Sequence, residues 1–363
     1  MKKVLISGYY GFHNTGDEAI LETLCKELSD AGVEVNVLSA APEETQRRYK
    51  VRAFNRANIG EVIRAVRNCD VLLSGGGSLF QDITSSASLY YYLGIVILGL
   101  IMRKGVHIYS QGIGPLNKRF NQKLFSKVIS KAKSISVRDA GSYDELVRLG
   151  VNRVPTTVTS DPVFLLEAAP AEQGAAILTQ AGLDVTDQNT LVGLAVRPWG
   201  DRETASGNFA ETADRIIEEF NVKLVLFPFH HPGDLDFTFE IVNKMKHKPF
   251  ILDKQYLPSQ IMSAMGLMHI NIGVRLHALI LSACMGVPII GISYDPKIDG
   301  FLNSMGLNSV CTYQNLQWDK IKEEVINISS NRASIIEAIT RKTQESKELA
   351  RKNLNQLLEE INR

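Results

Sequence analysis

Short apolar segments alternate with amphipathic segments along the first half of the chain. The apolar runs are bounded by glycine or polar residues, a pattern typical of buried strands. Between them, hydrophobic residues recur every three or four positions; Ile20, Leu24 and Leu28, for example, share one helical face. Strands that alternate with helices predict βαβ units and a mostly parallel sheet. The expected strands are 4–7, 33–38, 71–74, 106–110 and 134–138, and the expected helices are 17–31, 59–67, 120–132 and a short one from about residue 141.

The alternation breaks around Ser160 and restarts after a connector. Residues 167–189 are rich in Ala, Gln, Gly and Asp, and they predict a linker with one short helix. Residues 334–363 predict one long charged helix with an apolar stripe. A chain of 363 residues is longer than a domain with a single hydrophobic core usually is. We therefore predict two doubly wound α/β domains, 1–165 and 166–333, that face each other across a cleft. The strands expected in the second domain are 191–196, 222–227, 270–273 and 287–292, with helices near 208–220, 234–246, 258–265 and 276–285.

One stretch of the first domain raises the question of a membrane. Residues 83–102 carry no charge, and 90–102 are almost entirely apolar. The strictly apolar part is too short to span a bilayer. We therefore expect a buried helix of a globular core; a helix with a membrane-facing side and a true span are the alternatives. The first apolar run stops at Gly8, which predicts a strand rather than a signal peptide.

Composition narrows the function classes. Forty Lys and Arg residues balance 39 Asp and Glu residues, so the chain lacks the strongly basic character of a typical nucleic-acid binder. The four cysteines, Cys25, Cys69, Cys284 and Cys311, are far apart and form no CxxC pair. This spacing predicts reduced thiols rather than disulfides or a zinc site. The sequence contains no cluster of carboxylates typical of a metal site, so we expect neither a metal nor a cofactor.

In doubly wound sheets, ligands bind beyond the carboxyl ends of the strands, so the turns there are the first place to look for chemistry. The first turn, 8–17, is rich in glycine but lacks the GxGxxG spacing of a dinucleotide site. Three successive glycines, 75–77, leave backbone N–H groups open to a substrate, although close packing would also explain them. The acceptor-binding candidates from these two turns are Asn14, Asp17, Gly76, Gly77, Gln81 and Asp82.

The turn after residue 273 carries the sharpest signal. A strand ends there and a helix opens near Arg275, so free N–H groups, Arg275 and His277 would all face one anion. Lys297 follows the next strand in a turn fixed by proline, and Arg138 ends a strand of the first domain. Each of these cations could instead be an ordinary surface residue. Together they predict a cationic site with one titratable group, suited to a small, multiply charged anion.

Seven segments carry a family resemblance when taken in order. They are GYYGFHNTGDEAI, LLSGGGSLFQD, SQGIGP, SVRD, SDPVF, VRLHA and GISYDPKIDGF. In this order they resemble the polysaccharide pyruvyl transferase family, most closely the bacterial branch that pyruvylates a secondary cell-wall polymer for S-layer anchoring. The resemblance implies two Rossmann-like domains of the glycosyltransferase type B class. It also implies a C-terminal helix, residues 334–363, that crosses back to complete the first domain.

The resemblance also implies an activity. Pyruvate would pass from phosphoenolpyruvate, a co-substrate, to O4 and O6 of an N-acetylmannosamine on a lipid-diphosphate-linked disaccharide, forming a cyclic ketal and releasing phosphate. Arg275, Leu276 and His277 correspond to the family's donor-binding Arg-Leu-His, with Lys297 and Arg138 as further donor contacts. Such an enzyme would be cytoplasmic, at the inner face of the plasma membrane, where peripheral membrane contact and a homo-oligomer are both open.

Two roles remain open for His277, and two other functions compete. His277 would act as general acid and then base, or it would only bind phosphate, with His230 and His231 as a second proton source. The first competing function is a glycosyltransferase that uses a nucleotide sugar. No glutamate lies between Glu240 and Glu323, so the paired glutamates of retaining enzymes of that kind are missing. The second is a catalytically silent scaffold that binds lipid-linked glycan.

Overall fold

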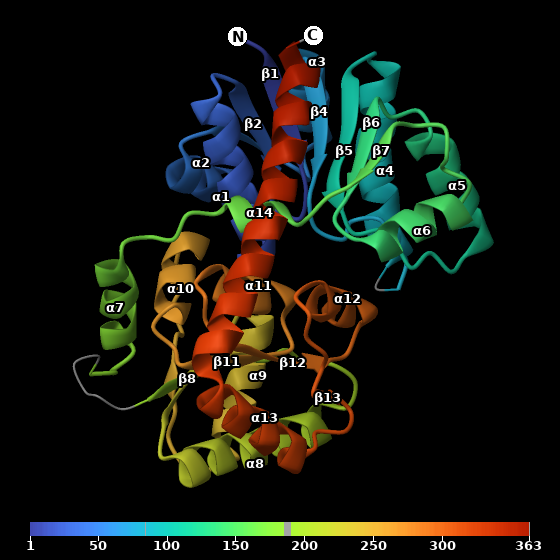
Figure 1. Ribbon diagram of the computed structural model, residues 1–363. Helices are drawn as coiled ribbons and strands as arrows, with labels where there is room; N and C mark the ends of the chain where they lie inside the picture. The colour runs from blue at the N-terminus through green and yellow to red at the C-terminus, as the bar shows by residue number, and fades with distance from the viewer. Residues whose placement is uncertain (84, 185–189, 363) are drawn as a thin grey trace. The chain divides into compact units, whose positions relative to one another are not determined.

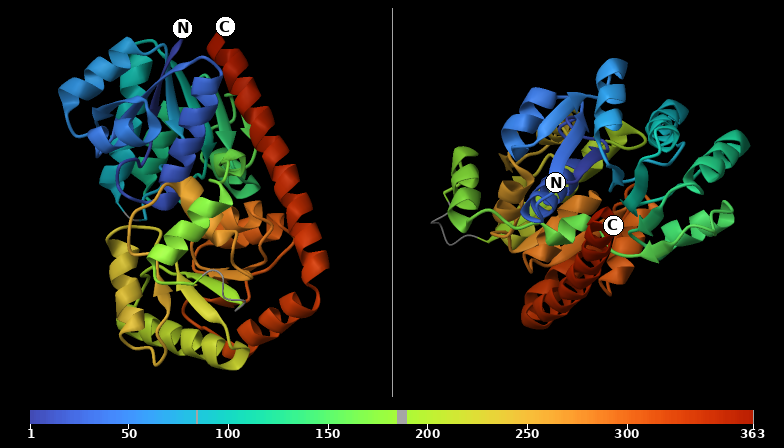
Figure 2. Two further views of the ribbon diagram at one scale, coloured as in Figure 1. Left: turned by 90° about the vertical axis from the view of Figure 1, so that its left-hand side faces the viewer. Right: turned by 90° about the horizontal axis from the view of Figure 1, so that it is seen from above.

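The computed structural model describes residues 1–83, 85–184 and 190–362, which form two compact units (Figure 1). Unit 1 comprises Met1–Phe12, Asp17–Leu166 and Ser346–Arg363, and unit 2 comprises His13–Gly16 and Glu167–Glu345. Each unit therefore contains a segment that is distant in sequence from its main body. Both chain ends lie at the same end of unit 1 (Figures 1 and 2).

Unit 1 is built on a seven-stranded parallel sheet with the order β3-β2-β1-β4-β5-β6-β7. Its strands are β1 (Lys3–Ser7), β2 (Glu34–Ser39), β3 (Arg52–Asn55), β4 (Val71–Gly75), β5 (Gly105–Gln111), β6 (Ser134–Val137) and β7 (Thr156–Val158). The central strands are almost wholly buried, which is why they read as continuous apolar runs. Its helices are α1 (Thr15–Asp30), α2 (Pro42–Tyr49), α3 (Ile59–Asn68), α4 (Ser86–Ile101), α5 (Arg119–Ile129) and α6 (Ala140–Arg148), and a 3₁₀ turn, η1, covers Pro162–Leu165.

Unit 2 repeats this architecture around a six-stranded parallel sheet with the order β10-β9-β8-β11-β12-β13. Its strands are β8 (Leu191–Ala195), β9 (Lys223–Leu226), β10 (Phe250–Ile251), β11 (Ile270–Gly273), β12 (Ile289–Ser293) and β13 (Cys311–Thr312). Its helices are α7 (Ala171–Gln180), α8 (Arg202–Phe220), α9 (Gly233–Val242), α10 (Pro258–Met265), α11 (Leu276–Cys284), α12 (Pro296–Ser304) and α13 (Trp318–Ser330). In both sheets the strand order reverses direction at the first strand, which places the expected ligand site at the carboxyl ends of the central strands.

The last helix, α14 (Arg332–Asn362), contributes to both units (Figure 2). Its final residues, Ser346 onward, belong to unit 1, where apolar Leu354, Leu357 and Ile361 are buried. Polar contacts fix the register: the side chain of Asn353 donates to Ser110 Oγ at 3.0 Å, and Thr159 Oγ1 donates to the carbonyl of Leu349 at 3.0 Å.

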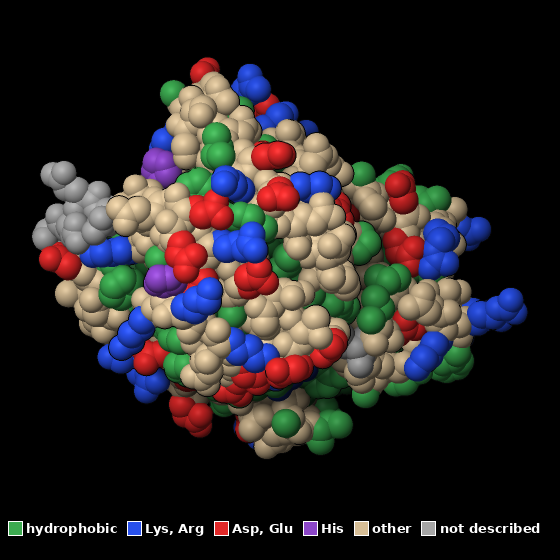
Figure 3. Space-filling model, turned by 90° about the horizontal axis from the view of Figure 1, so that it is seen from below, with side chains coloured by type: hydrophobic (Ala, Val, Ile, Leu, Met, Phe, Trp, Pro, Cys, Tyr) green, Lys and Arg blue, Asp and Glu red, His purple; other side chains and the backbone are tan. Residues whose placement is uncertain are grey.

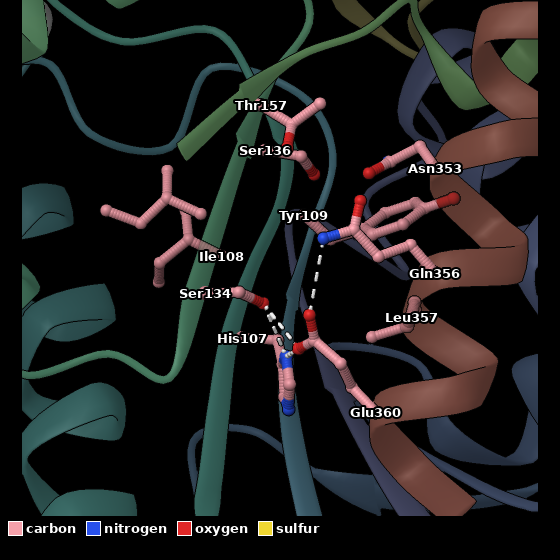
Figure 4. Close-up of a pocket in the computed structure, with 11 residues that line it drawn as sticks. His107, Ile108, Tyr109, Ser134, Ser136, Thr157, Asn353, Gln356, Leu357 and Glu360 are labelled. Atoms are coloured by element: carbon pink, nitrogen blue, oxygen red, sulfur yellow. Dashed lines mark hydrogen bonds and ion pairs between the residues drawn. The ribbon is translucent and has the colours of Figure 1, made fainter. Parts of the chain in front are cut away.

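A buried polar group holds the end of α14 against β5 and β6 (Figure 4). Nδ1 of His107 lies 2.8 Å from Ser134 Oγ and 3.1 Å from the carboxylate of Glu360, and Ser134 also donates to Glu360 at 2.9 Å. Burial, together with the nearby Lys133, lowers the pKa of His107 to about 4 even though Glu360 opposes the shift. His107 is therefore neutral near pH 7, and the contact is a hydrogen bond to a carboxylate rather than a full ion pair.

The expected fold class is confirmed, since both halves are parallel, doubly wound α/β units. The strand at 270–273 was predicted to the residue, and the helix at 258–265 likewise. The hydrophobic pattern did not predict several elements that are short or only weakly periodic. These are the strands β3, β7, β10 and β13 and the helices α2, α12 and α13. Part of the connector, residues 185–189, lies outside the described residues.

The uncharged stretch forms α4, and only one face of it is buried. Leu89, Leu93 and Val96 pack into the unit 1 core, as the buried-helix prediction requires. The opposite face is exposed, with Ile101 73% exposed. Among the residues that the structure describes, no helix is long and apolar enough to cross a membrane.

Candidate active site

Four turns at the carboxyl edge of the unit 2 sheet bring basic side chains toward one another. They follow the neighbouring strands β8, β9, β11 and β12. We call the residues that they carry the strand-end cluster: Arg197, His230, Arg275, His277 and Lys297. All five side chains are partly exposed, although Nε2 of His277 and Nε of Arg197 are themselves buried.

Arg275 is fixed by a buried carboxylate. Its Nε donates to Asp234 Oδ2 at 2.7 Å, and its Nη2 donates to Asp234 Oδ1, so the pair is bidentate. Asp234 lies in the first turn of α9, is fully buried and also accepts the backbone N–H of Phe229 at 3.2 Å. This geometry orients the guanidinium and leaves three of its five N–H donors outside the bidentate pair.

His277 stands in the first turn of α11, for which Arg275 is the N-cap residue. Its ring packs against Gly16, so closely that a Cβ on Gly16 would collide with Nδ1 of His277. The segment that carries Gly16 is itself bound to unit 2: Thr15 N donates to the carbonyl of Phe229 at 2.7 Å, and His231 N donates to the carbonyl of His13 at 3.1 Å. The middle of the first glycine-rich turn therefore supports the strand-end cluster.

Lys297 lies at the start of α12, where Asp295 caps the helix. Its ammonium is 3.4 Å from the Asp295 carboxylate and 5.4 Å from the centre of the Tyr294 ring. Both partners are half-exposed, so the ammonium keeps access to solvent. The aromatic ring attracts the ammonium to this place without neutralising its charge.

Arg197 is a member of the cluster that the sequence interpretation missed. Its Nη1 donates to the hydroxyl of Tyr294 at 2.6 Å, and its guanidinium lies 4.7 Å from the Tyr294 ring centre and 5.4 Å from that of Trp199. Its Nε is buried and has no hydrogen-bond partner among the described residues. The signal was available, because Arg197 follows strand β8 just as Arg275 follows β11.

The two histidines after β9 are held neutral. Burial lowers the pKa of His230, and the positive charges of Arg275 and Arg197 lower it further. Burial also lowers the pKa of His231. The lowered pKa values favour the neutral form of both imidazoles, in which one ring nitrogen carries a hydrogen and the other is an acceptor.

Arg138, the remaining donor candidate, lies in unit 1 and is already paired. Its Nη1 is 3.3 Å from the buried Asp161 carboxylate, its Nη2 donates to Ser78 Oγ at 2.9 Å, and its Nε is 3.6 Å from Asp139. The side chain is only 6% exposed. Arg138 thus ties the end of β6 to the residue that follows the glycine triplet.

Two of the acceptor candidates, Asp82 and Gln81, make hydrogen bonds that stabilise the local backbone. Asp82 is buried and accepts from Asn117 N at 2.8 Å, from Lys118 N at 3.0 Å and from the side chain of Asn121 at 2.9 Å. Burial opposes its ionisation, but these hydrogen bonds hold the pKa of Asp82 below its usual value. Gln81 caps the backbone N–H of Ile83.

The other candidates shape the backbone near the start of α1. Asn14 accepts from Gly16 N at 3.1 Å and caps α1. Gly76 and Gly77 have φ values of +59° and +79°, which favour glycine. A Cβ on Gly77 would lie 3.0 Å from the carboxylate of Asp17, so that carboxylate borders the triplet.

Comparisons with solved structures support the fold. The structure is similar to UDP-GlcNAc 2-epimerase from Neisseria meningitidis bound to UDP-GlcNAc, with a TM-score of 0.63, 12% identity, and coverage of 98% of this chain and 100% of that one. It is also similar to HepE from Anabaena in complex with UDP-glucose, with a TM-score of 0.68, 12% identity and complete coverage of both chains. At this identity the likeness shows the shared two-unit fold of the glycosyltransferase type B class.

Sequence comparisons carry the relationship further. The amylovoran biosynthesis protein AmsJ of Erwinia amylovora is 21% identical over 313 residues, covering 82% of this chain and 74% of AmsJ. The family model for polysaccharide pyruvyl transferases matches residues 14–296, which include every residue of the strand-end cluster except Lys297. With a match over well more than half its length, this chain belongs to the polysaccharide pyruvyl transferase family.

Proposed function

We propose that this transferase moves the pyruvyl group of phosphoenolpyruvate onto two hydroxyls of one sugar, forming a cyclic ketal. The observation that carries the proposal is the strand-end cluster, where three cationic side chains and His277 gather within one unit. Membership of the pyruvyl transferase family supplies the reaction type, and the cluster supplies a donor site of matching charge.

The donor's charges fit the cations that surround the start of α11. Phosphoenolpyruvate carries a carboxylate and a phosphate, and Arg275 and Arg197 both present guanidinium N–H groups suited to such oxygens. Lys297 adds a compact positive charge beside Tyr294. The free N–H groups of α11 and its dipole favour an anion at the same place. These groups would be preorganised, because Asp234 and Tyr294 already hold the two arginines.

In the proposed reaction, a proton is added to the methylene carbon of phosphoenolpyruvate, and the first sugar hydroxyl attacks the neighbouring carbon. The C–O bond to phosphate then breaks, and the second hydroxyl closes the ring and loses its proton as phosphate departs. The two hydroxyl protons balance the new methyl group and the released phosphate. We assign the proton transfers to His277, a role typically worth a factor of roughly 10²–10⁴ in rate.

For the acceptor, we propose an N-acetylmannosamine that is pyruvylated at O4 and O6 on a lipid-diphosphate-linked disaccharide. This follows the resemblance to the cell-wall branch of the family. The relative AmsJ is itself named for the biosynthesis of a polysaccharide, amylovoran, which supports a glycan acceptor. Asp17, Gly76 and Gly77 are the acceptor-side residues that we propose, and the reaction would take place at the inner face of the plasma membrane.

A nucleotide-sugar-dependent glycosyltransferase is the second candidate. Solved structures of the same fold hold UDP-GlcNAc and UDP-glucose, which supports a nucleotide sugar as the donor. Against it, residues 241–322 contain no glutamate, whereas retaining enzymes of this fold use a pair.

The test compares donors directly. Phosphate release from phosphoenolpyruvate is followed with and without a synthetic lipid-diphosphate disaccharide that ends in N-acetylmannosamine, and the product mass is measured. Parallel reactions contain UDP-glucose or UDP-N-acetylglucosamine. We expect phosphate release that depends on the acceptor, and a mass increase of one pyruvyl ketal. Hexose transfer from a UDP-sugar without phosphate release would establish the second candidate instead.

Variants of His277 separate its two roles. His277→Gln and His277→Ala are compared with His247→Ala, an exposed histidine paired with Glu218 on the surface of the same unit. A general acid–base role predicts a large fall in kcat with nearly unchanged phosphoenolpyruvate affinity. A fall in affinity alone would restrict His277 to binding phosphate, and unchanged turnover would exclude both roles.

A further inference from the structure

One segment of this chain carries an excess of positive charge. Residues 83–138 contain nine Lys and Arg residues and no Asp or Glu. The rest of the chain carries all 39 acidic residues and therefore has an excess of negative charge. This segment forms α4, β5 and α5 of unit 1, so the asymmetry of charge in the sequence becomes an asymmetry on the surface.

The solvent-facing side of α4 is apolar along its whole length. Ala87, Tyr90, Gly94 and Ile101 are exposed on this side, and Ile97 between them is partly buried against the core. Leu89, Leu93 and Val96 occupy the opposite, buried side. A surface helix of a soluble domain normally presents polar residues to water, and α4 has no charged residue among its 16. The exposed stripe is thus not explained by packing within unit 1.

The neighbouring helix α5 adds an exposed aromatic residue and a row of cations. Phe120 is 68% exposed, and its ring lies 6.5 Å from that of Tyr90 in an edge-to-face arrangement. Arg119, Lys123 and Lys127 are exposed on the same helix, and positions 120, 123 and 127 share one face. In Figure 3, Lys and Arg side chains project beside exposed hydrophobic ones at the right-hand edge of the view, where α5 and α6 lie.

Hydrogen bonds hold this surface in place. The Tyr90 hydroxyl donates to Asn121 Oδ1 at 2.8 Å, and the Lys118 ammonium donates to Ser86 Oγ at 2.9 Å. Asp82 accepts hydrogen bonds from the backbone of Asn117 and Lys118, just before α5, and from the side chain of Asn121 in its first turn. The aromatic side chain of Phe120 is therefore presented to solvent by a rigid support rather than by a loose loop.

We propose that the α4–α5 face, meaning Tyr90, Ile97, Ile101, Phe120, Arg119, Lys123 and Lys127, docks on an anionic phospholipid bilayer. Exposed aromatic and aliphatic side chains would enter the boundary between headgroups and acyl chains, and the cations of α5 would pair with lipid phosphates. A second copy of the chain is a poor occupant, because a two-fold pairing would set the cations of one α5 against those of the other. This proposal stands apart from pyruvyl transfer, since vesicle binding requires neither donor nor acceptor.

Co-sedimentation of the full chain with vesicles tests the proposal. Vesicles of phosphatidylcholine are compared with vesicles that also contain phosphatidylglycerol, at low and high salt. We expect binding to the anionic vesicles that weakens as salt rises. Phe120→Ser should lower the partition coefficient about tenfold. Arg119→Gln and Lys123→Gln should each lower it about fivefold, the effect expected for one interfacial charge.

Matched variants on unit 2 provide the control. Phe239→Ser removes another exposed phenylalanine, and Lys254→Gln removes another exposed lysine. Both should bind vesicles as the wild type does. The proposal is overturned if wild-type protein ignores anionic vesicles, or if the control variants lose as much binding as the α4–α5 face variants. A Phe120→Ser variant that changes only the oligomeric state in size-exclusion chromatography would assign the face to a second copy of the chain.

Discussion

Gly16 and His277 are 261 positions apart in sequence, yet the imidazole of His277 fills the space that a side chain on Gly16 would occupy. Gly16 belongs to the short segment His13–Gly16, which is bound to unit 2 by backbone hydrogen bonds to Phe229 and His231. The absence of a side chain at position 16 therefore sets the position of the proposed proton carrier.

Gly16→Ala should move the His277 ring while leaving the fold intact. A displacement of about 1 Å at a reacting group costs on the order of 100-fold in rate, so we expect a fall of that size in kcat. Circular dichroism and the melting temperature check the fold, and Gly207→Ala, in an open position on α8, is the control. Activity close to wild type would show that the ring tolerates displacement and is not the proton carrier.

Arg197→Met should weaken donor binding rather than the chemical step. The methionine keeps most of the contact with Trp199 and Tyr294 but removes a charged partner of the anion. Hydrogen bonds to charged groups are worth about 1.5–3 kcal/mol, so KM for phosphoenolpyruvate should rise roughly 10- to 100-fold. Arg215→Met is the matched control, because Arg215 also lies over an aromatic ring, that of Trp318, on the surface of α8. A KM equal to that of the control variant would remove Arg197 from the donor site.

His107 should make the stability of unit 1 sensitive to acid. Burial lowers the pKa of His107 from 6.5 to about 4. Between pH 4 and 6.5, this histidine is therefore protonated in the unfolded chain and neutral in the folded one. Stability from this group is complete above pH 6.5 and falls as the pH drops toward 4, by about 3 kcal/mol at most. Urea unfolding across this range should show a shallower pH dependence for His107→Gln than for wild type.

The exposed His247 provides the comparison for that experiment. The change in pH dependence should be larger for His107→Gln than for His247→Gln, because His107 is buried and the His247 side chain is 41% exposed. Parallel pH profiles for His107→Gln and wild type would mean that other groups account for any loss of stability in acid.

Asp82→Ala should loosen the start of α5. The substitution leaves the N–H groups of Asn117 and Lys118 and the amide of Asn121 without their carboxylate acceptor. Losing hydrogen bonds to a buried charged group should cost about 2–3 kcal/mol of unfolding free energy. Hydrogen exchange should accelerate first at residues 117–121. Asp144→Ala, an exposed position on α6, should change neither quantity.

The strands and the central turn were predictable because their signals are local. Ile270–Gly273 is an apolar run that ends in glycine, and Arg275 and His277 follow it directly. Arg197 was missed because its significance depends on Tyr294, which is 97 residues away and reaches it only once β8 and β12 join the same sheet. Two partners of Arg138 were equally hidden, since Asp161 and Ser78 come from distant turns, whereas Asp139 is its neighbour in sequence.

Nor could the sequence reveal which side of α4 is covered. Its 16 residues are uncharged on both sides, so periodicity alone does not distinguish the buried face from the exposed one. The sequence also could not reveal that His13–Gly16 belongs to unit 2. This contact depends on backbone hydrogen bonds to distant residues, which the identity of the side chains does not indicate.

The contribution of α14 to unit 1 affects the order in which the chain can fold during translation. Residues from Ser346 onward leave the ribosome only after all of unit 2 has been synthesised. Until then, the surface of β5 and β6 that receives Leu357, Ile361 and Glu360 stays open to solvent or to chaperones. The unit that is translated first is thus the last to be completed, and a ribosome stalled shortly before residue 346 would hold a first unit that still lacks its last segment.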